Sequence, residues 1–247
     1  MPQTAQQFWD SVAPITKYLV LGSVLTTVLT GFGLVPYYYL HLDFNSIFSR
    51  DLQVWRLFTN LFFFGGFSLN LLFNLLFLIQ FSSKLENGHF EGRTADFAFM
   101  FLVGFFPMTF AAWLLGVPYL SFSYLTYLVY IWCNKNPEEN LSMMFIPVTI
   151  PARYFPWALM GLHVLMGGSP IGDLIGIVSG HIYHYLDDYY PRYYGTRVLK
   201  TPQFLYSIFP PTRMNGAVHG FGGPQQRNPQ PQQPAGRNWG AGRRLAD

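Results

Sequence analysis

The sequence predicts an all-α polytopic membrane protein with six helical spans and a polar C-terminal tail. Hydrophobic residues make up 51% of its 247 residues and charged residues 11%, whereas charged residues reach about 25% in a soluble domain. A chain of this composition cannot hide its apolar surface from water, so lipid is its expected solvent. Polar residues and prolines divide the apolar sequence into six predicted spans, 18–40, 67–81, 97–115, 119–133, 152–167 and 170–190.

Residues 1–16 are polar and are predicted to form a short interfacial helix before the first span. Residues 4–7, Thr-Ala-Gln-Gln, resemble a capping box, and Phe8, Val12 and Ile15 fall on one face of the helix that would follow. A frayed N-terminus is the alternative. The segment has neither a basic cluster before an apolar run nor a small-residue cleavage site, so the first span is expected to act as a retained signal anchor.

Three charged connectors follow the second, fourth and sixth spans, namely residues 84–93, residues 134–140 and the tail after Tyr190. With six crossings and a cytosolic N-terminus, all three connectors lie on the cytosolic side. Of the fifteen Lys and Arg residues, Arg50 and Arg56 alone then lie on the opposite side, thirteen against two. This bias follows the positive-inside rule, so both termini are predicted to be cytosolic.

The second and fourth spans are predicted to be short. About 15 residues at 1.5 Å each give roughly 22 Å of helix, against a hydrocarbon core of about 30 Å. Short spans must thin the bilayer locally or lie among longer ones. Alternatively, these spans extend into the Phe and Leu residues that flank them.

Polar side chains mark the approach to the second span and its interior. Trp55 and Arg56 precede it, where the ring would anchor at the membrane surface and the guanidinium would bind carbonyls or lipid phosphate. Asn70 and Asn74 share one helix face at i and i+4, and Gln80 follows further on. Polar groups inside lipid must face protein or water, so these residues are either helix–helix contacts or the lining of a hydrophilic groove open to one leaflet.

The sixth span carries glycines at a spacing that favours close helix packing. Gly172, Gly176 and Gly180 form two overlapping G-x-x-x-G steps, and His181 follows directly. Removing the side chains at these positions lets a second helix approach closely. The sixth span is therefore expected to pack on another span through these residues.

Other kinds of site are not indicated. The net charge of +3 gives no sign of a nucleic-acid partner, and the single cysteine, Cys133, excludes an internal disulfide. His181, His184 and Asp188 have the spacing of one helix face, but no matching Cys/His cluster accompanies them, so no metal site and no cofactor are predicted. A histidine- and tyrosine-rich membrane interface is the expected role of this segment.

Together, these motifs resemble the rhomboid superfamily. The resemblance covers the W-R pair, the two asparagines and the glycine–histidine pattern: Trp55, Arg56, Asn70, Asn74, Gly172, Gly176, Gly180 and His181. Rhomboid proteases carry His-x-x-x-Asn on the second helix, where this chain has Asn70 first. Their sixth helix packs on the fourth and carries the catalytic histidine, so His181 resembles that residue. The resemblance implies a six-helix rhomboid-like bundle.

The nucleophile of a rhomboid protease is missing from the sequence. No Gly-x-Ser-Gly occurs in the 247 residues. The fourth span offers Ser121 and Ser123, but bulky Phe122 and Tyr124 stand where an oxyanion hole would need small residues. We therefore predict no catalytic residues and no protease activity.

The tail ends in a short apolar motif within a polar segment. Residues 216–242 are rich in Gly, Gln, Pro, Asn and Arg, a composition that predicts disorder. The last residues resemble the SHP box, which binds the N-domain of the AAA+ ATPase that extracts ubiquitylated proteins. The matching residues are Trp239, Gly240, Gly242, Arg244 and Leu245. The motif usually ends in Gly, where this chain has Ala246.

With two further segments, residues 92–97 (Gly-Arg-Thr-Ala-Asp-Phe) and 199–202 (Leu-Lys-Thr-Pro), the chain resembles the derlin family over nearly its whole length. The resemblance implies a rhomboid pseudoprotease of the endoplasmic reticulum membrane that acts in ER-associated degradation. It also implies four kinds of partner: the AAA+ unfoldase bound through the tail, a membrane ubiquitin ligase complex, misfolded luminal or membrane substrates, and the lipid bilayer.

The expected organisation is an interfacial helix at 1–16, a six-span membrane domain at 17–192 and a cytosolic tail at 193–247. The expected activity is assistance to the retrotranslocation of misfolded proteins, by local membrane thinning and a polar groove. The alternatives are a passive scaffold for the ATPase and the ligase, an active intramembrane protease, and a transporter or channel. The last is disfavoured because repeated broken helices with ionisable midplane residues are not seen.

Overall fold

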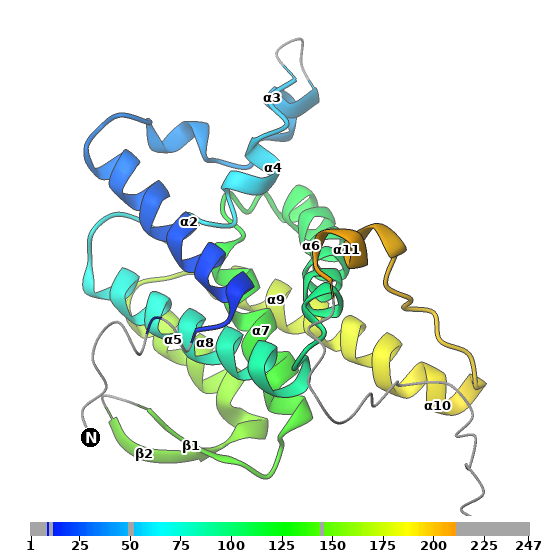
Figure 1. Ribbon diagram of the computed structural model, residues 1–247. Coiled ribbons are helices and arrows are strands. Elements are labelled where there is room, and N and C mark those ends of the chain that lie inside the picture. Colours follow the sequence, from blue (N-terminus) through cyan, green and yellow to red (C-terminus); the bar gives the residue numbers. More distant parts are fainter. Residues whose placement is uncertain (1–8, 10–11, 49–51, 144–145, 211–247) are drawn as a thin grey trace, which may run out of the picture. The chain divides into compact units, whose positions relative to one another are not determined.

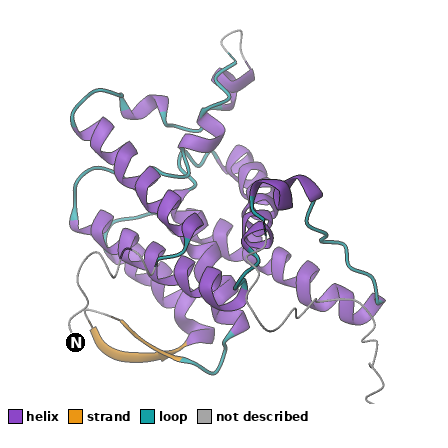
Figure 2. Cartoon of the chain, in the orientation of Figure 1, coloured by secondary structure: helices purple, strands orange, loops and turns teal. Residues whose placement is uncertain are grey.

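The computed structural model describes residues 9, 12–48, 52–143 and 146–210, all of which belong to one compact unit. Helices dominate this part of the chain, and its sheet consists of two short strands (Figures 1 and 2). Most of the predicted interfacial helix and the predicted SHP-like motif lie outside the described residues.

Each predicted span overlaps one of the longer helices, although four of these helices begin before or end after the predicted bounds. These are α2 (Pro14–Gly31), α5 (Leu69–Lys84), α6 (Thr94–Leu115), α7 (Ser121–Lys135), α8 (Phe155–Leu165) and α9 (Pro170–His184). Shorter elements connect them: the 3-10 turns η1 (Tyr37–Tyr39) and η3 (Ala152–Tyr154), the π-helical turns η2 (Leu85–His89) and η4 (Tyr185–Tyr189), and α3 (Phe44–Phe48), α4 (Arg56–Thr59), α10 (Tyr190–Tyr194) and α11 (Gln203–Ile208).

The first helix is shorter than predicted. The prediction extended it to Leu40, but α2 ends at Gly31. Gly33 follows with φ of 71°, a left-handed conformation that suits glycine and terminates helices. Pro36 follows three residues later. It has no backbone N–H, so it cannot donate the hydrogen bond that a continued helix would need. The apolar residues up to Leu40 therefore belong to a loop and to η1.

A β-hairpin was not predicted. Strand β1 (Asn140–Met143) pairs antiparallel with β2 (Ile146–Pro151) in the connector between α7 and α8, with Leu141 opposite Ile150. Pro147 and Pro151 argue against a strand, but a two-stranded sheet has edges on both sides, where proline is tolerated. The register shifts between Ser142 and Met143, and this irregularity further weakened the strand pattern in the sequence.

Helix α7 forms the centre of the bundle. It packs against α5, α6, α8 and α9, and Tyr127, Leu128, Val129 and Ile131 are fully buried. A helix that is buried on all sides is expected at the core of a bundle. Its Tyr127 hydroxyl donates to the carbonyl oxygen of Met100 on α6, at 2.8 Å.

Helix α6 has the length and composition of a membrane span. Among the described helices, it alone has at least 18 residues and is apolar enough to cross a membrane. Only 22% of its most apolar 18-residue stretch is buried inside the protein. Phe106 and Phe110 are among its exposed side chains. By contrast, α5 has 16 residues and α7 has 15, so each is about 22–24 Å long at 1.5 Å per residue, less than a hydrocarbon core of about 30 Å.

A buried glutamate from the connector after α5 holds the start of α2. Glu86 accepts hydrogen bonds from the backbone N–H groups of Ile15 and Thr16, at 3.0 and 2.9 Å, and from the Thr16 hydroxyl at 2.9 Å. It thereby satisfies amides of the first turn, which have no partner inside the helix, and its negative charge suits that end of the helix.

We expect Glu86→Ala to reduce the free energy of unfolding by about 2–4 kcal/mol, because buried amides of α2 lose a charged acceptor. Thermal unfolding of the detergent-solubilised protein measures the change. Glu91→Ala, which removes an exposed carboxylate a few residues along, serves as the control. Equal stability of the two variants would show that Glu86 does not hold α2.

Candidate functional site

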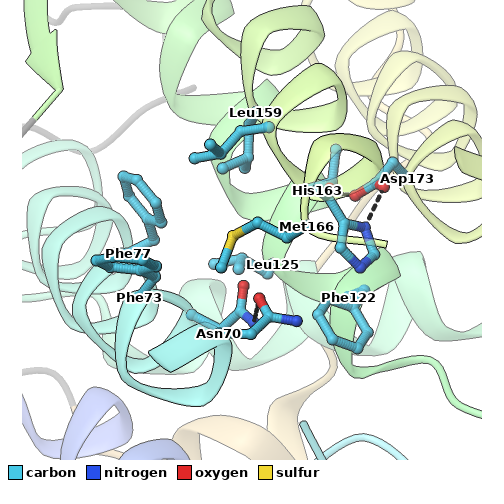
Figure 3. A pocket seen from close by; sticks show the side chains of 12 residues that line it. Asn70, Phe73, Phe77, Phe122, Leu125, Leu159, His163, Met166 and Asp173 are labelled. Carbon is cyan, nitrogen blue, oxygen red and sulfur yellow. Dashed lines mark hydrogen bonds and ion pairs between the residues drawn. The ribbon is translucent and has the colours of Figure 1, made fainter. Parts of the chain in front are cut away.

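The two asparagines of the second span line a pocket between α5, α7, α8 and α9 in which polar side chains lie among apolar ones (Figure 3). The Asn74 side-chain amide donates to the Asn70 side-chain oxygen at 2.9 Å. Asn74 is buried and Asn70 half-buried. The i, i+4 spacing on α5 therefore brings the two amides together and directs them towards the other helices.

Across the pocket, a histidine of α8 pairs with an aspartate of α9. His163 Nδ1 lies 2.6 Å from Asp173 Oδ2, and the Thr126 hydroxyl of α7 donates to Asp173 Oδ1 at 2.7 Å. The His163 ring stacks on Phe122, with ring centres 4.3 Å apart. Three helices thus meet at one buried carboxylate, whose polar contacts replace the water it has lost.

The pocket is narrow in this structure. Its cavity volume is about 10 Å³, roughly the space of one water molecule. Helices α5 and α8 both pack against α7, and the pocket lies between them. The lack of a side chain at Gly168 leaves room for the His163 ring, because a Cβ at that position would overlap the imidazole.

Neither His163 nor Asp173 was predicted from the sequence as a site residue. Asp173 lies in the first turn of α9, where a negative charge is favourable, but the N-cap is Ser169, whose hydroxyl accepts from Ile171 N at 3.4 Å. An ionisable residue within an apolar span is itself a signal of function. Applying that rule to His163 and Asp173 would have marked both as candidate site residues, although not as partners.

The glycines of α9 lie against α7. A Cβ at Gly176 would overlap the carbonyl oxygen of Ser123, and one at Gly180 would lie 2.7 Å from the Tyr130 ring. A Cβ at Gly172 would reach Ser123 Oγ at 3.6 Å, an ordinary contact. Gly176 therefore marks the closest approach of the two helices.

His181 is exposed and does not line the pocket. Its Nδ1 lies 2.8 Å from the Tyr130 hydroxyl. Neither serine of the fourth span is hydrogen-bonded to His181. Ser121 donates to the carbonyl oxygen of Phe63 at 2.7 Å, and the buried hydroxyl of Ser123 has no hydrogen-bond partner. The histidine that resembles a catalytic base therefore contacts a tyrosine.

The Trp55-Arg56 pair organises the loop between α2 and α5. Arg56 is buried and donates to the backbone carbonyls of Tyr38 and His41, the latter at 3.0 Å. It also donates to the side chain of Gln53. Trp55 is half exposed. The guanidinium thus binds carbonyls within the loop, which is one of the two roles predicted for it.

Gln80 is half-buried further along α5 and does not line the pocket. Among the described residues, no group of three or more His, Cys, Asp or Glu side chains is arranged to hold a metal ion.

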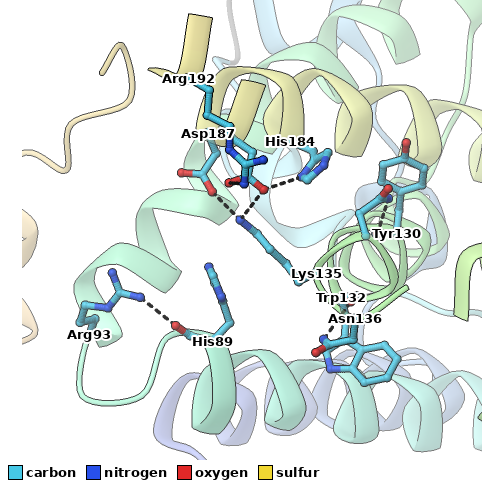
Figure 4. A network of polar contacts seen from close by, with 11 residues as sticks. His89, Arg93, Tyr130, Trp132, Lys135, Asn136, His184, Asp187 and Arg192 are labelled. Atoms are coloured by element: carbon cyan, nitrogen blue, oxygen red, sulfur yellow. Dashed lines mark hydrogen bonds and ion pairs between the residues drawn. The ribbon is translucent and has the colours of Figure 1, made fainter. Parts of the chain in front are cut away.

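A second polar cluster lies at the C-terminal end of α7 (Figure 4). Lys135 at the end of α7 forms ion pairs with Asp187, at 2.9 Å, and Asp188, at 3.3 Å, both in η4. Arg192 lies 3.7 Å from Asp188. The cluster borders an open cavity of about 620 Å³ that His89 of η2 also lines. The ion pairs of Lys135 therefore connect α7 to η4, the segment that follows α9.

We expect the stability of the protein to fall as the pH drops below about 6.5, the ordinary histidine pKa, partly because of His89. Burial lowers the pKa of His89 in the folded protein, and the nearby positive charges of Lys135 and Arg93 lower it further. The unfolded chain therefore takes up a proton that the folded chain resists, until the pH passes below the folded pKa. Unfolding measured between pH 7.5 and 5 should show a shallower fall for His89→Gln. A control variant, His41→Gln, changes an exposed histidine; if it flattens the profile equally, His89 is not the group responsible.

The described residues form a helical bundle in which paired amides on α5 face a histidine–aspartate pair from α8 and α9, and α6 is long and apolar enough to span a membrane. The sequence model of the Der1-like family matches residues 12–203. Derlin-1 of Arabidopsis thaliana is 37% identical over 214 residues, 86% of this chain and 80% of that protein. Derlin-2.1 of Zea mays is 34% identical over 220 residues, 85% of this chain and 88% of that protein. The probable derlin-2 homolog of Dictyostelium discoideum is 33% identical over 215 residues, 84% of each chain.

The chain belongs to the Der1-like family, the derlins. This is a polytopic membrane family, so the predicted all-α membrane fold is confirmed, and so is the predicted family. Derlins are inactive rhomboid-like proteins with a role in ER-associated degradation.

Proposed function

We propose that this derlin assists the retrotranslocation of misfolded proteins from the endoplasmic reticulum to the cytosol without cutting them. The observation that carries the proposal is the buried pocket in which Asn70 and Asn74 face His163 and Asp173. Polar and ionisable residues inside a membrane bundle are rare and commonly mark a functional site. An unfolded polypeptide in lipid is a polar partner that would suit such a site, because each bare backbone group costs several kcal/mol there.

Opening of the pocket is the step that would admit a substrate. The cavity of about 10 Å³ is too small for a polypeptide, so α5 and α8 must move apart next to α7. The amides and the histidine would then offer hydrogen bonds to a passing backbone. The short helices α5 and α7 favour a locally thinned bilayer, which lowers the barrier further.

The sequence supports the proposed location, orientation and partners of the protein. The protein would lie in the endoplasmic reticulum membrane with both termini in the cytosol, as the distribution of Lys and Arg indicates. The motif at Trp239–Leu245 would bind the AAA+ unfoldase, which pulls the substrate, and a membrane ubiquitin ligase complex would modify it. The absence of Gly-x-Ser-Gly and the Tyr130 partner of His181 support a non-proteolytic role.

A passive scaffold is the second candidate, and the small volume of the pocket, about 10 Å³, favours it because a polypeptide does not fit there. The two functions differ in whether the substrate touches the pocket. A photo-crosslinking amino acid in place of Met166, which lines the pocket, should capture a substrate during its degradation several-fold more often than the same group at Phe110, an exposed position on α6. Equal or weaker capture at Met166 would favour the scaffold.

A serine-reactive fluorophosphonate probe tests the protease alternative, and no labelling is expected.

A further inference from the structure

One carboxylate fastens the segment that follows the membrane bundle. Asp96, in the first turn of α6, accepts hydrogen bonds from the hydroxyls of Thr201 and Tyr206 on the same oxygen, Oδ1, each at 2.6 Å. Its other oxygen, Oδ2, lies 3.7 Å from Arg93. Two of the sequence motifs, residues 92–97 and 199–202, therefore meet at this point, where α11 packs on α6 (Figure 1). We call the three residues Asp96, Thr201 and Tyr206 the Asp96 clamp.

Little apolar surface is buried where α11 packs on α6. Leu205 is the buried side chain of α11, and Phe204, Tyr206 and Ile208 are exposed. A helix of six residues is not stable by itself. The attachment of α11 to α6 therefore depends on the two hydroxyl bonds to Asp96 and on Leu205.

Thr201 combines this contact with the features of a phosphorylation site. It is half-buried, it lies outside any helix or strand, and Pro202 follows it. A residue before proline is held in an extended conformation, the form in which a kinase binds its substrate. We propose that Thr201 is a phosphorylation site for a proline-directed protein kinase, and that the phosphate opens the Asp96 clamp and releases α11 from α6. The proposal uses the cytosolic placement of this end of the bundle but does not depend on the dislocation mechanism.

The reaction is phosphoryl transfer from ATP. The Thr201 hydroxyl oxygen forms a bond to the γ-phosphorus, the bond from that phosphorus to the β–γ bridging oxygen breaks, ADP leaves, and the hydroxyl proton passes to the base of the kinase.

The product cannot keep the clamp closed. Phosphothreonine has lost the O–H that donated to Asp96, and it carries a charge of about −1.5 to −2 beside a carboxylate. Arg93 supplies one positive charge at this place, which is less than the added negative charge. With the clamp open, residues 195–208 would lengthen the segment between α10 and the predicted ATPase-binding motif.

The test uses the full-length protein in detergent, with a peptide of residues 196–208 as the substrate control. A proline-directed kinase with ATP should phosphorylate Thr201 in both, as shown by mass spectrometry. Asp96→Asn, which weakens the clamp, should be phosphorylated several-fold faster. Hydrogen exchange at the amides of residues 203–208 should accelerate about ten-fold after phosphorylation or in Thr201→Glu, as expected for a helix that detaches.

Ser207→Glu is the matched control, because it adds a negative charge to α11 at an exposed residue whose hydroxyl bonds its own helix at Gln203 O. Its exchange should stay near that of the unmodified protein. The proposal is overturned if the kinase labels neither the peptide nor the protein, or labels the peptide while leaving Thr201 unmodified in both the wild type and Asp96→Asn. Unchanged or slower exchange after phosphorylation also overturns it, since the phosphate would then have bound Arg93 and kept α11 in place.

Discussion

Gly176→Leu is expected to reduce the free energy of unfolding by about 3 kcal/mol or more, because it forces a side chain into the tightest helix contact of the bundle. A Cβ at Gly176 would overlap the backbone oxygen of Ser123 and lie 3.0 Å from Thr126 Cβ. A backbone atom cannot swing away as the end of a flexible side chain can. Helix α9 would have to move from α7, and Thr126 would then lose its bond to Asp173.

Thermal unfolding in detergent and the amount of protein in the membrane measure this effect. Gly161→Leu is the matched control, since a Cβ at Gly161 meets no atom within 4 Å. We expect the control to leave stability unchanged or to raise it by up to about 1 kcal/mol, because leucine favours a helix more than glycine does. If Gly176→Leu behaves like its control, α9 does not depend on close packing against α7.

The double substitution Trp239→Ala, Leu245→Ala is expected to weaken capture of the AAA+ ATPase by at least about ten-fold, because buried Trp and Leu anchors carry most of the affinity of such short motifs. Pull-down of the purified ATPase N-domain with the full-length chain measures it. Asn238→Ala, beside the motif but outside its pattern, is the control. Undiminished capture by the double variant would mean that the ATPase does not bind through this motif.

Strong local signals in the sequence predicted the helices well. Long apolar stretches bounded by Pro and Gly gave one helix for each predicted span, as at Pro170, where α9 begins. The errors arose where short-range geometry decides. The left-handed Gly33 ends α2 within an apolar run, and the hairpin of β1 and β2 forms through pairing across a connector whose prolines and polar residues favour a loop.

The candidate site was predicted on one helix only. Asn70 and Asn74 could be paired because a helix brings i and i+4 together, whatever the rest of the fold does. The partnership of His163 and Asp173 crosses from α8 to α9 through a loop, and Glu86 reaches α2 across 71 residues of chain. Such contacts depend on tertiary packing and leave no periodic trace in one sequence.

The most direct test of the proposed function is a degradation chase of an ER-retained misfolded substrate in cells whose only copy of this derlin carries Asn70→Leu and Asn74→Leu. The account predicts a substrate half-life several-fold longer than with the wild-type protein, while the ligase and the ATPase still co-purify. Gln80→Leu is the control, an identical amide-to-leucine change on α5 outside the pocket, and it should leave the half-life unchanged. An unchanged half-life with Asn70→Leu, Asn74→Leu would contradict the account and leave the protein as a scaffold.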